Sequence, residues 1–354
     1  MEKYNKMDIE GNTPKAMEKN RNNSNFIPMD EEKESFKSKE LNKIKLNDIK
    51  SSSELNCSTS TNHSNTTDKS ISSQNESSIN KSSIKADIEK ERENVQFNAE
   101  YLEEIYTNLI YDEKMLKLAI NKDYMSEQKE INHKMRAILI DWIIEVHNCF
   151  HLKSKTLFQV VYIIDLYLSY KIIKRIDLQL LGVASLLIAF KSNEVYCPSL
   201  QQFIDITNDA YTKAELLDME KEILRTLNFE ILFPTAEEFY SIISRSYNFT
   251  EVQNNLGNYF LDSSLIEYAL LKYKPSTIGV ACAYIVMKFF RINGYKDLYS
   301  SKMVNENSPQ KTIKECAKEL CFLVKNLSVS NLKSARTKYS SAKYNNVASI
   351  CDEK

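Results

Sequence analysis

The sequence has only five glycines in 354 residues, at positions 11, 182, 257, 279 and 294. No two of them lie close enough together to form a glycine-rich loop that cradles phosphate. P-loop enzymes, dinucleotide-binding folds and the protein kinase fold are therefore excluded, because each builds its nucleotide site from closely spaced glycines.

The chain also lacks a charge excess, a cysteine pattern and a long apolar run. Its 47 Lys and Arg residues nearly balance 48 Asp and Glu residues, so the net charge of -1 gives no reason to expect a nucleic acid or a membrane as partner. Seven cysteines show no pairing pattern, which indicates an intracellular protein with reduced thiols. We find no signal peptide, and no run approaching the roughly 18 to 20 apolar residues of a membrane span.

Residues 1–96 are poor in the residues that build a core. Ser, Asn, Lys and Glu dominate this segment, and its only aromatic residues are Tyr4, Phe26 and Phe36. Such a composition buries too little apolar surface to offset the entropy of ordering the chain. The sequence therefore predicts a disordered tail.

From Tyr101 onward apolar residues recur at helical spacing, and alternating runs with strand turns are missing. Capping boxes begin at Thr212, Thr235 and Thr250, each with Glu or Gln three residues later, and each predicts a helix start. This part of the chain is predicted to be all-α.

An internal repeat relates two helices. Gly182-Val183-Ala184 and Gly279-Val280-Ala281 each precede a lysine, Lys191 or Lys288, and the offset is 97 residues throughout. A glycine inside a helix costs about 1 kcal/mol relative to alanine, so its presence in both helices indicates close packing of a neighbour. We predict a helix and first lobe at 97–233, a second lobe at 234–345 and an extension at 346–354. Chance recurrence of the triplet is the alternative.

The twelve residues Met135-Arg136-Ala137-Ile138-Leu139-Ile140-Asp141-Trp142-Ile143-Ile144-Glu145-Val146 resemble the signature helix of the mitotic A- and B-type cyclins. Further matches at 178–182, 211–213, 219–220, 223–229 and 338–344 extend the resemblance over about residues 97–350. The resemblance implies two tandem five-helix cyclin boxes after an N-terminal helix. It also implies a non-catalytic subunit, without cofactor, that activates a cyclin-dependent kinase in the nucleus and cytoplasm at the G2/M transition.

One face of the signature helix is predicted to be functional. Residues 135, 138, 139 and 142 share a stripe, for which a core position is the simpler interpretation. In cyclins this stripe lines a groove that docks Arg-x-Leu peptides of substrates or inhibitors. The resemblance assigns to the groove Met135, Ile138, Leu139, Trp142, Glu145, Leu178 and Gln179. It also implies a buried ion pair between Arg136 and Asp141, whose rupture would cost about 3 to 5 kcal/mol.

Kinase contact is the main function that the resemblance implies. In cyclins a lysine and a glutamate, here Lys191 and Glu220, hold the backbone around the mobile helix of the kinase. The neighbouring positions that match are Ile188, Leu224, Phe229 and Ile231, with Tyr101 and Ile105 on the preceding helix.

The chain departs from the cyclin pattern beside this lysine. Ser192 and Asn193 stand where an aromatic and an acidic residue are common, and Asn108 also replaces an aromatic residue. Loss of an aromatic from an interface centre can remove about 2 kcal/mol or more of binding. The changes favour a divergent kinase partner. The alternatives are a cyclin-fold scaffold that uses only the groove, and a transcription-type cyclin.

The sequence was also searched for a metal site, degradation motifs and phosphorylation sites. His147, Cys149 and His151 lack a second ligand pair, so we predict no metal site. Neither a destruction box nor a Lys-Glu-Asn box occurs in the tail. Thr13 and Ser308 precede prolines and are candidate phosphorylation sites for a proline-directed kinase.

Overall fold

The computed structural model describes residues 101–195, 197–292 and 309–351, which all belong to one compact unit. Every regular element in these ranges is a helix, so the prediction of an all-α fold is confirmed. The predicted tail at 1–96 and the candidate phosphorylation sites Thr13 and Ser308 lie outside the described residues.

The first lobe consists of five helices. They are α4 (His133–Cys149), α5 (Ser154–Tyr170), α6 (Leu178–Asn193), α7 (Leu200–Asp205) and α8 (Lys213–Thr226), with the short helices η4 (Tyr124–Ser126) and η5 (Arg175–Asp177). α6 is the central helix, because it packs against α4, α5 and α8 and is buried continuously from Leu180 to Phe190.

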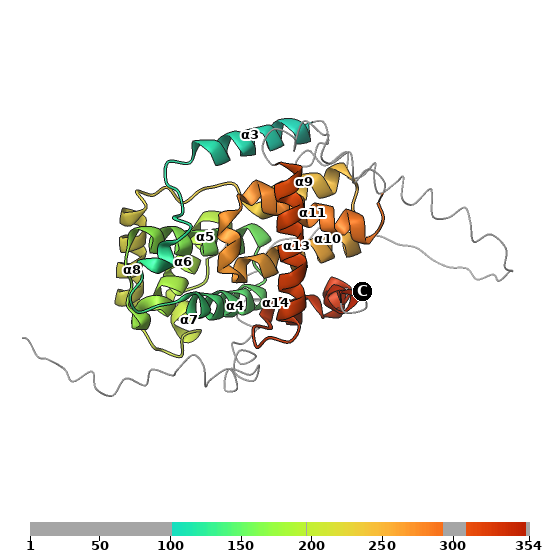
Figure 1. The fold of residues 1–354 in the computed structure, drawn as a ribbon. Coiled ribbons are helices and arrows are strands. Elements are labelled where there is room, and N and C mark those ends of the chain that lie inside the picture. The colour runs from blue at the N-terminus through green and yellow to red at the C-terminus, as the bar shows by residue number, and fades with distance from the viewer. Residues whose placement is uncertain (1–100, 196, 293–308, 352–354) are drawn as a thin grey trace, which may run out of the picture. The chain divides into compact units, whose positions relative to one another are not determined.

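The second lobe follows the same plan. Its helices are α9 (Ala236–Ser246), α10 (Glu251–Ile266), α11 (Pro275–Phe289) and α13 (Gln310–Leu327), with η6 (Tyr268–Lys272) between α10 and α11. The chain then forms α14 (Ser334–Tyr339), η8 (Ala342–Tyr344) and α15 (Val347–Ile350). α11 is central here, packed against α9, α10 and α13. Figure 1 shows the first lobe in green to yellow beside the second lobe in orange to red.

Helix α3 (Leu102–Met115) packs across the second lobe. It buries Leu102, Tyr106 and Ile110 on one face. The Tyr106 ring meets Phe239 edge to face at 5.4 Å between centroids. At the other end, the Glu113 carboxylate accepts hydrogen bonds from the Ser276 backbone N–H (2.8 Å) and hydroxyl (2.7 Å), and so caps the first turn of α11.

The helix starts that the sequence marks are those of the structure. Thr212, Thr235 and Thr250 each accept a hydrogen bond from the backbone N–H three residues on, and the Glu or Gln at that position bonds back. All three predicted capping boxes are confirmed. A fourth, at Ser199 and Gln202, begins α7.

In each lobe, the first helix packs closely against the repeated glycine of the central helix. A Cβ on Gly182 would lie 2.9 Å from the Cδ1 atom of Leu139 on α4. A Cβ on Gly279 would lie 2.6 Å from the backbone oxygen of Ala236 on α9. The close packing predicted from the repeat is therefore confirmed. Helices α4 and α6 of the first lobe correspond to α9 and α11 of the second.

One segment corrects an expectation. By length and composition alone, Arg175–Asn193 is apolar enough to cross a membrane, although we expected no stretch to approach that length. Most of this segment is α6, and 67% of its most apolar window is buried inside the protein. Its composition follows from its place at the centre of the first lobe.

The glycine contacts generate a prediction. Gly279→Ala is expected to lower the free energy of unfolding by about 1 to 3 kcal/mol, because the new methyl group meets rigid backbone. Gly182→Ala meets the end of a leucine side chain, which can move, and should cost much less. Urea unfolding of both variants measures the difference, and equal stability of the two would contradict the prediction.

Candidate functional site

Lys191 and Glu220 meet on the surface of the first lobe. The Lys191 Nζ atom donates to both carboxylate oxygens of Glu220, at 2.6 and 2.9 Å. The lysine side chain is 48% exposed and the glutamate side chain 11% exposed. Lys191 belongs to the last turn of α6, where a cation is favoured by the helix dipole, and Glu220 lies on α8. The two residues are thus paired and accessible to a partner from one side.

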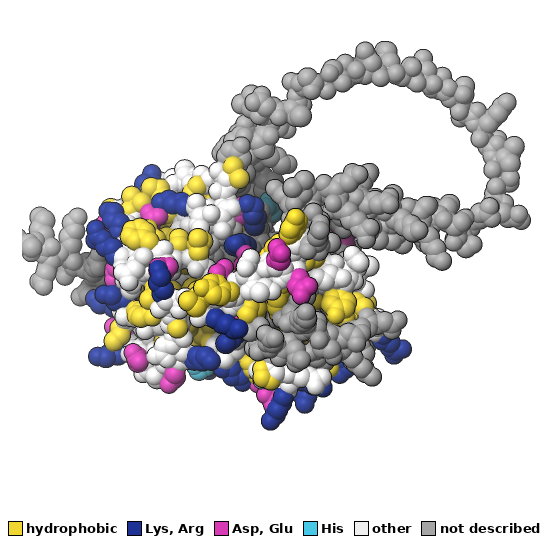
Figure 2. Space-filling model, turned by 90° about the horizontal axis from the view of Figure 1, so that it is seen from above, with side chains coloured by type: hydrophobic (Ala, Val, Ile, Leu, Met, Phe, Trp, Pro, Cys, Tyr) yellow, Lys and Arg dark blue, Asp and Glu magenta, His cyan; other side chains and the backbone are white. Residues whose placement is uncertain are grey.

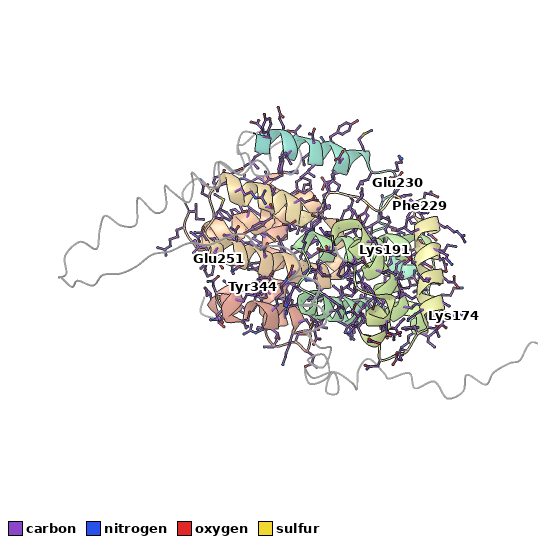
Figure 3. All side chains as sticks on the ribbon, turned by 180° about the vertical axis from the view of Figure 1, so that it is seen from behind. Lys174, Lys191, Phe229, Glu230, Glu251 and Tyr344 are labelled. Carbon is purple, nitrogen blue, oxygen red and sulfur yellow. The ribbon has the colours of Figure 1, made fainter. Side chains whose placement is uncertain are left out.

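Phe229 is an exposed aromatic residue close to Glu220 along α8: its N–H donates to the carbonyl oxygen of Leu224 at 2.9 Å, and Leu224 lies one helical turn after Glu220. Phe229 follows α8, is 68% exposed and has a φ of 61°, in the left-handed region that bulky residues rarely adopt. Figure 3 shows Lys191 and Phe229 at the same end of the first lobe. An apolar ring held outward by an unfavourable backbone conformation is typical of a functional position.

The other predicted kinase contacts differ in exposure. Ile188 is buried, and Leu224 and Ile231 are half-buried. Tyr101 (51%), just before α3, and Ile105 (43%) on α3 are exposed beside the buried face of that helix. Figure 2 views the side of the molecule that carries α3, where hydrophobic side chains lie among basic ones.

A hydrogen-bond network that the sequence did not reveal supports this surface. The buried side chain of Gln159 on α5 accepts a hydrogen bond from the Asn193 amide and donates one to the Ile231 carbonyl oxygen at 3.0 Å. Asn193 thereby links the end of α6 to the turn after α8. Glu194, next in the chain, accepts from the Thr156 hydroxyl at 2.6 Å and the Lys153 N–H at 2.9 Å at the start of α5.

A cavity of about 410 Å³ lies between α3, α5 and the segment that joins the lobes. Tyr162 and Phe233, whose rings stack, form part of its apolar wall together with Leu116 and Leu232. Two ion pairs also line the cavity: Lys117 with Glu230 at 2.5 Å, and Lys155 with Glu238 at 2.6 Å.

The predicted peptide groove is only partly accessible. Met135, Ile138, Trp142 and Glu145 on α4 are half-buried, as is Gln179 on α6. Leu139 and Leu178 are completely buried, because the close approach of α4 to Gly182 seals the seam between the helices. These two leucines support the surface from below, and the other five residues are those that a peptide can reach.

The predicted ion pair between Arg136 and Asp141 is wrong. Residues five apart on a helix point about 140° away from each other, whereas side chains three or four apart are neighbours. Arg136 instead binds Asp165 on α5 through two hydrogen bonds of 2.7 Å, with both side chains almost fully buried. Asp141 accepts a hydrogen bond from the Ser334 N–H at 2.9 Å.

Arg136 also reaches the second lobe. Its Nη1 atom donates to the carbonyl oxygens of Leu265 (3.0 Å) and Ile266 (3.3 Å) at the end of α10. The Tyr124 hydroxyl donates to the Asp165 carboxylate at 2.8 Å. Burial alone would lower the pKa of Arg136, but the charge of Asp165 outweighs it and raises that pKa.

The histidines and cysteine at 147–151 form no ligand cluster. His147 is buried, and its Nε2 atom bonds the Lys153 carbonyl oxygen at 3.0 Å. Burial and, next, the charge of Lys338 lower the pKa of His147 to about 4. In the part of the chain that the structure describes, no three His, Cys, Asp or Glu side chains are grouped as metal ligands.

Comparison with known proteins agrees with this architecture. The family model for the cyclin N-terminal domain matches residues 104–232, and that for the cyclin C-terminal domain matches residues 234–353. A viral cyclin from herpesvirus saimiri shares the fold, with a TM-score of 0.52 and 22% identity over 61% of this chain and 97% of its own. The chain belongs to the cyclin family.

Within the family it resembles the B-type mitotic cyclins. It is 36% identical over 256 residues to the G2/mitotic-specific cyclin-B of Dictyostelium discoideum, a match that covers 71% of this chain and 57% of that protein. It is 33% identical over 255 residues to the G2/mitotic-specific cyclin-B of Hydra vulgaris, covering 71% of this chain and 68% of that protein. The chain thus spans a little more than half the length of the first of these relatives.

The corrected ion pair generates a prediction. Asp165→Asn leaves the buried guanidinium of Arg136 without a counter-charge and is expected to lower the free energy of unfolding by about 3 to 5 kcal/mol. Asp141→Asn keeps an oxygen that can accept from Ser334 and should cost distinctly less. Urea unfolding of the two variants checks the order, and the reverse order would restore Asp141 as the partner of Arg136.

Proposed function

We propose that this chain is the regulatory subunit of a cyclin-dependent Ser/Thr kinase, which it binds and activates at the G2/M transition. The observation that carries the proposal is the Lys191–Glu220 pair beside exposed Phe229. An exposed aromatic ring can act as an apolar anchor in a protein interface, and an accessible charged pair near it can fix the register and orientation of the partner. The relatives described as G2/mitotic-specific support the assignment to that transition.

The chain contributes to the reaction by supplying binding energy to the kinase. A cyclin that binds the active conformation of a kinase more tightly than the inactive one shifts the equilibrium between the two. Lys191 and Glu220 offer hydrogen bonds to kinase backbone, and Phe229 offers apolar area to bury. We propose that the chain itself supplies no catalytic group, and that it acts in the nucleus and cytoplasm.

The accessible face of α4 is proposed to recruit substrates. Trp142, Ile138 and Met135 give a shallow apolar surface, and Glu145 can receive a cationic side chain. An Arg-x-Leu peptide carries both features that this surface can bind. Docking would raise the local concentration of a substrate without altering the kinase itself.

The kinase interface can be tested with matched double variants. The full chain, Lys191→Ala/Glu220→Ala and the control Asp218→Ala/Lys221→Ala are used to capture kinase from a lysate of the source cell, and histone phosphorylation by each eluate is measured. The control removes an exposed ion pair on the same helix, α8. We expect activity with the wild type and the control, and a loss of about tenfold or more with Lys191→Ala/Glu220→Ala.

Two outcomes would contradict this proposal. Equal activity in all three eluates would place the kinase contact elsewhere on the molecule. No kinase in any eluate would favour a cyclin-fold scaffold, and would make Ser192 and Asn193 the residues to exchange next.

The groove is tested by substrate choice. Met135→Ala/Trp142→Ala is expected to lower phosphorylation of a substrate with an Arg-x-Leu motif by about tenfold, because apolar anchors dominate such interfaces. A substrate without the motif should be phosphorylated as before, which also shows that the variant is folded. The control Ile172→Ala/Ile176→Ala removes two exposed apolar side chains elsewhere on the first lobe. An equal loss on both substrates would refute the docking role.

A further inference from the structure

The internal repeat gives the second lobe a surface built like the proposed kinase-binding surface of the first lobe. Lys288 lies in the last turn of α11, as Lys191 lies in the last turn of α6. Helix α13 packs against α11, as α8 packs against α6. Each lobe also has an exposed phenylalanine near this surface, although the two are not equivalent at the offset of 97 residues: Phe322 on α13 is 67% exposed, and Phe229 after α8 is 68% exposed.

The two surfaces differ in charge. Glu220 neutralises Lys191, but at the offset of 97 residues the counterpart of Glu220 is Ala317. Lys288 is exposed and forms no ion pair within residues 101–195, 197–292 and 309–351. Its described neighbour is the ring of Tyr284, whose centroid lies 5.9 Å from the Lys288 Nζ atom. The second lobe therefore presents a net positive charge where the first lobe presents a neutral pair.

Helix α13 extends this positive charge along its exposed face. Its lysines occur at helical spacing opposite the buried face, at positions 311, 314, 318 and 325. Helix α13 carries four Lys residues but only two Glu residues, in a chain whose net charge is -1. Of these two, Glu319 is engaged by Lys272 at 2.8 Å and by the Tyr273 hydroxyl at 3.0 Å.

Phe322 lies within this lysine array. It follows Lys318 by four residues and precedes Lys325 by three, so both lysines flank it on the helix surface. Helix α11, which carries Lys288 in its last turn, packs directly against α13. An exposed aromatic ring among cations offers an apolar anchor together with an attractive field.

We propose that Lys288, Lys318, Phe322 and Lys325, the α13 basic face, bind an acidic protein segment that carries an apolar side chain. The charge and the ring together favour a peptide over the other polyanions. A nucleic acid is held by repeated phosphate contacts and needs no apolar anchor. A membrane surface needs a broader apolar face than one ring.

The test measures peptide binding by the full chain. The probe is a fluorescein-labelled peptide of twelve residues, acidic except for one central Phe, and its dissociation constant is read from fluorescence anisotropy. Lys318→Glu/Lys325→Glu is expected to weaken binding by about tenfold or more. The control Lys171→Glu/Lys174→Glu makes the same charge change at exposed lysines of the first lobe and should leave the constant within about twofold.

A second pair of measurements separates the anchor from the charge. Phe322→Ser should weaken binding of the probe that carries Phe. It should leave unchanged the binding of a probe in which Ser replaces that Phe. Because Phe322 is exposed, this variant should unfold at the wild-type temperature. Capture of kinase by Lys318→Glu/Lys325→Glu should also match the wild type, so that the outcome here is independent of the proposed kinase interface.

Three results would overturn the proposal. Equal weakening by the first-lobe control would show that the probe responds only to overall charge. Unchanged binding of the Phe-containing probe by Phe322→Ser would show that Phe322 is not an apolar anchor. Tighter binding of a 20-base-pair duplex or of phosphatidylserine vesicles than of the peptide, lost in Lys318→Glu/Lys325→Glu, would assign the face to a phosphate-bearing polyanion instead.

Discussion

The rest of the structure depends on one buried cation, the guanidinium of Arg136. A buried charge is tolerated only where a counter-charge and hydrogen-bond acceptors surround it. Arg136 finds the carboxylate of Asp165 within its own lobe and the carbonyl oxygens of Leu265 and Ile266 at the end of α10 in the other. These acceptors come together in one arrangement of the two lobes, so the cation selects that arrangement as well as stabilising it.

A second set of contacts fixes α4 from the other direction. Asp262 on α10 is fully buried and binds the Lys338 ammonium group at 2.7 Å and the Tyr339 hydroxyl at 3.0 Å. The segment that carries these residues also bonds Asp141 on α4 through the Ser334 N–H. Helix α4 is thus held by both lobes, and its outward side chains, including Trp142, are presented by a rigid element. Such preorganisation reduces the entropy that a docking peptide must lose.

Local chemistry explains which features could be predicted from the sequence. Capping boxes act over three residues and helix stripes over seven, so the helix starts at Thr212, Thr235 and Thr250 were predicted and are confirmed. The partner of Arg136 lies 29 residues away on another helix, where no local spacing rule reaches. The link from Asn193 through Gln159 to Ile231 joins three separate segments for the same reason. Burial of Leu139 likewise depends on how closely α4 approaches Gly182, which the stripe alone does not determine.

The repeat shows how packing and surface charge follow different constraints. Gly182 and Gly279 both lie where the first helix of a lobe approaches its central helix, and a side chain there meets atoms already in place. Lys191 and Lys288 are exposed, and the position opposite each lysine differs between the lobes: it is Glu220 in the first lobe and Ala317 in the second. The repeated architecture therefore constrains the core of both lobes, whereas the charge of their outer surfaces can differ. The two ends of this molecule carry the same architecture with different charge, which suits them to different partners.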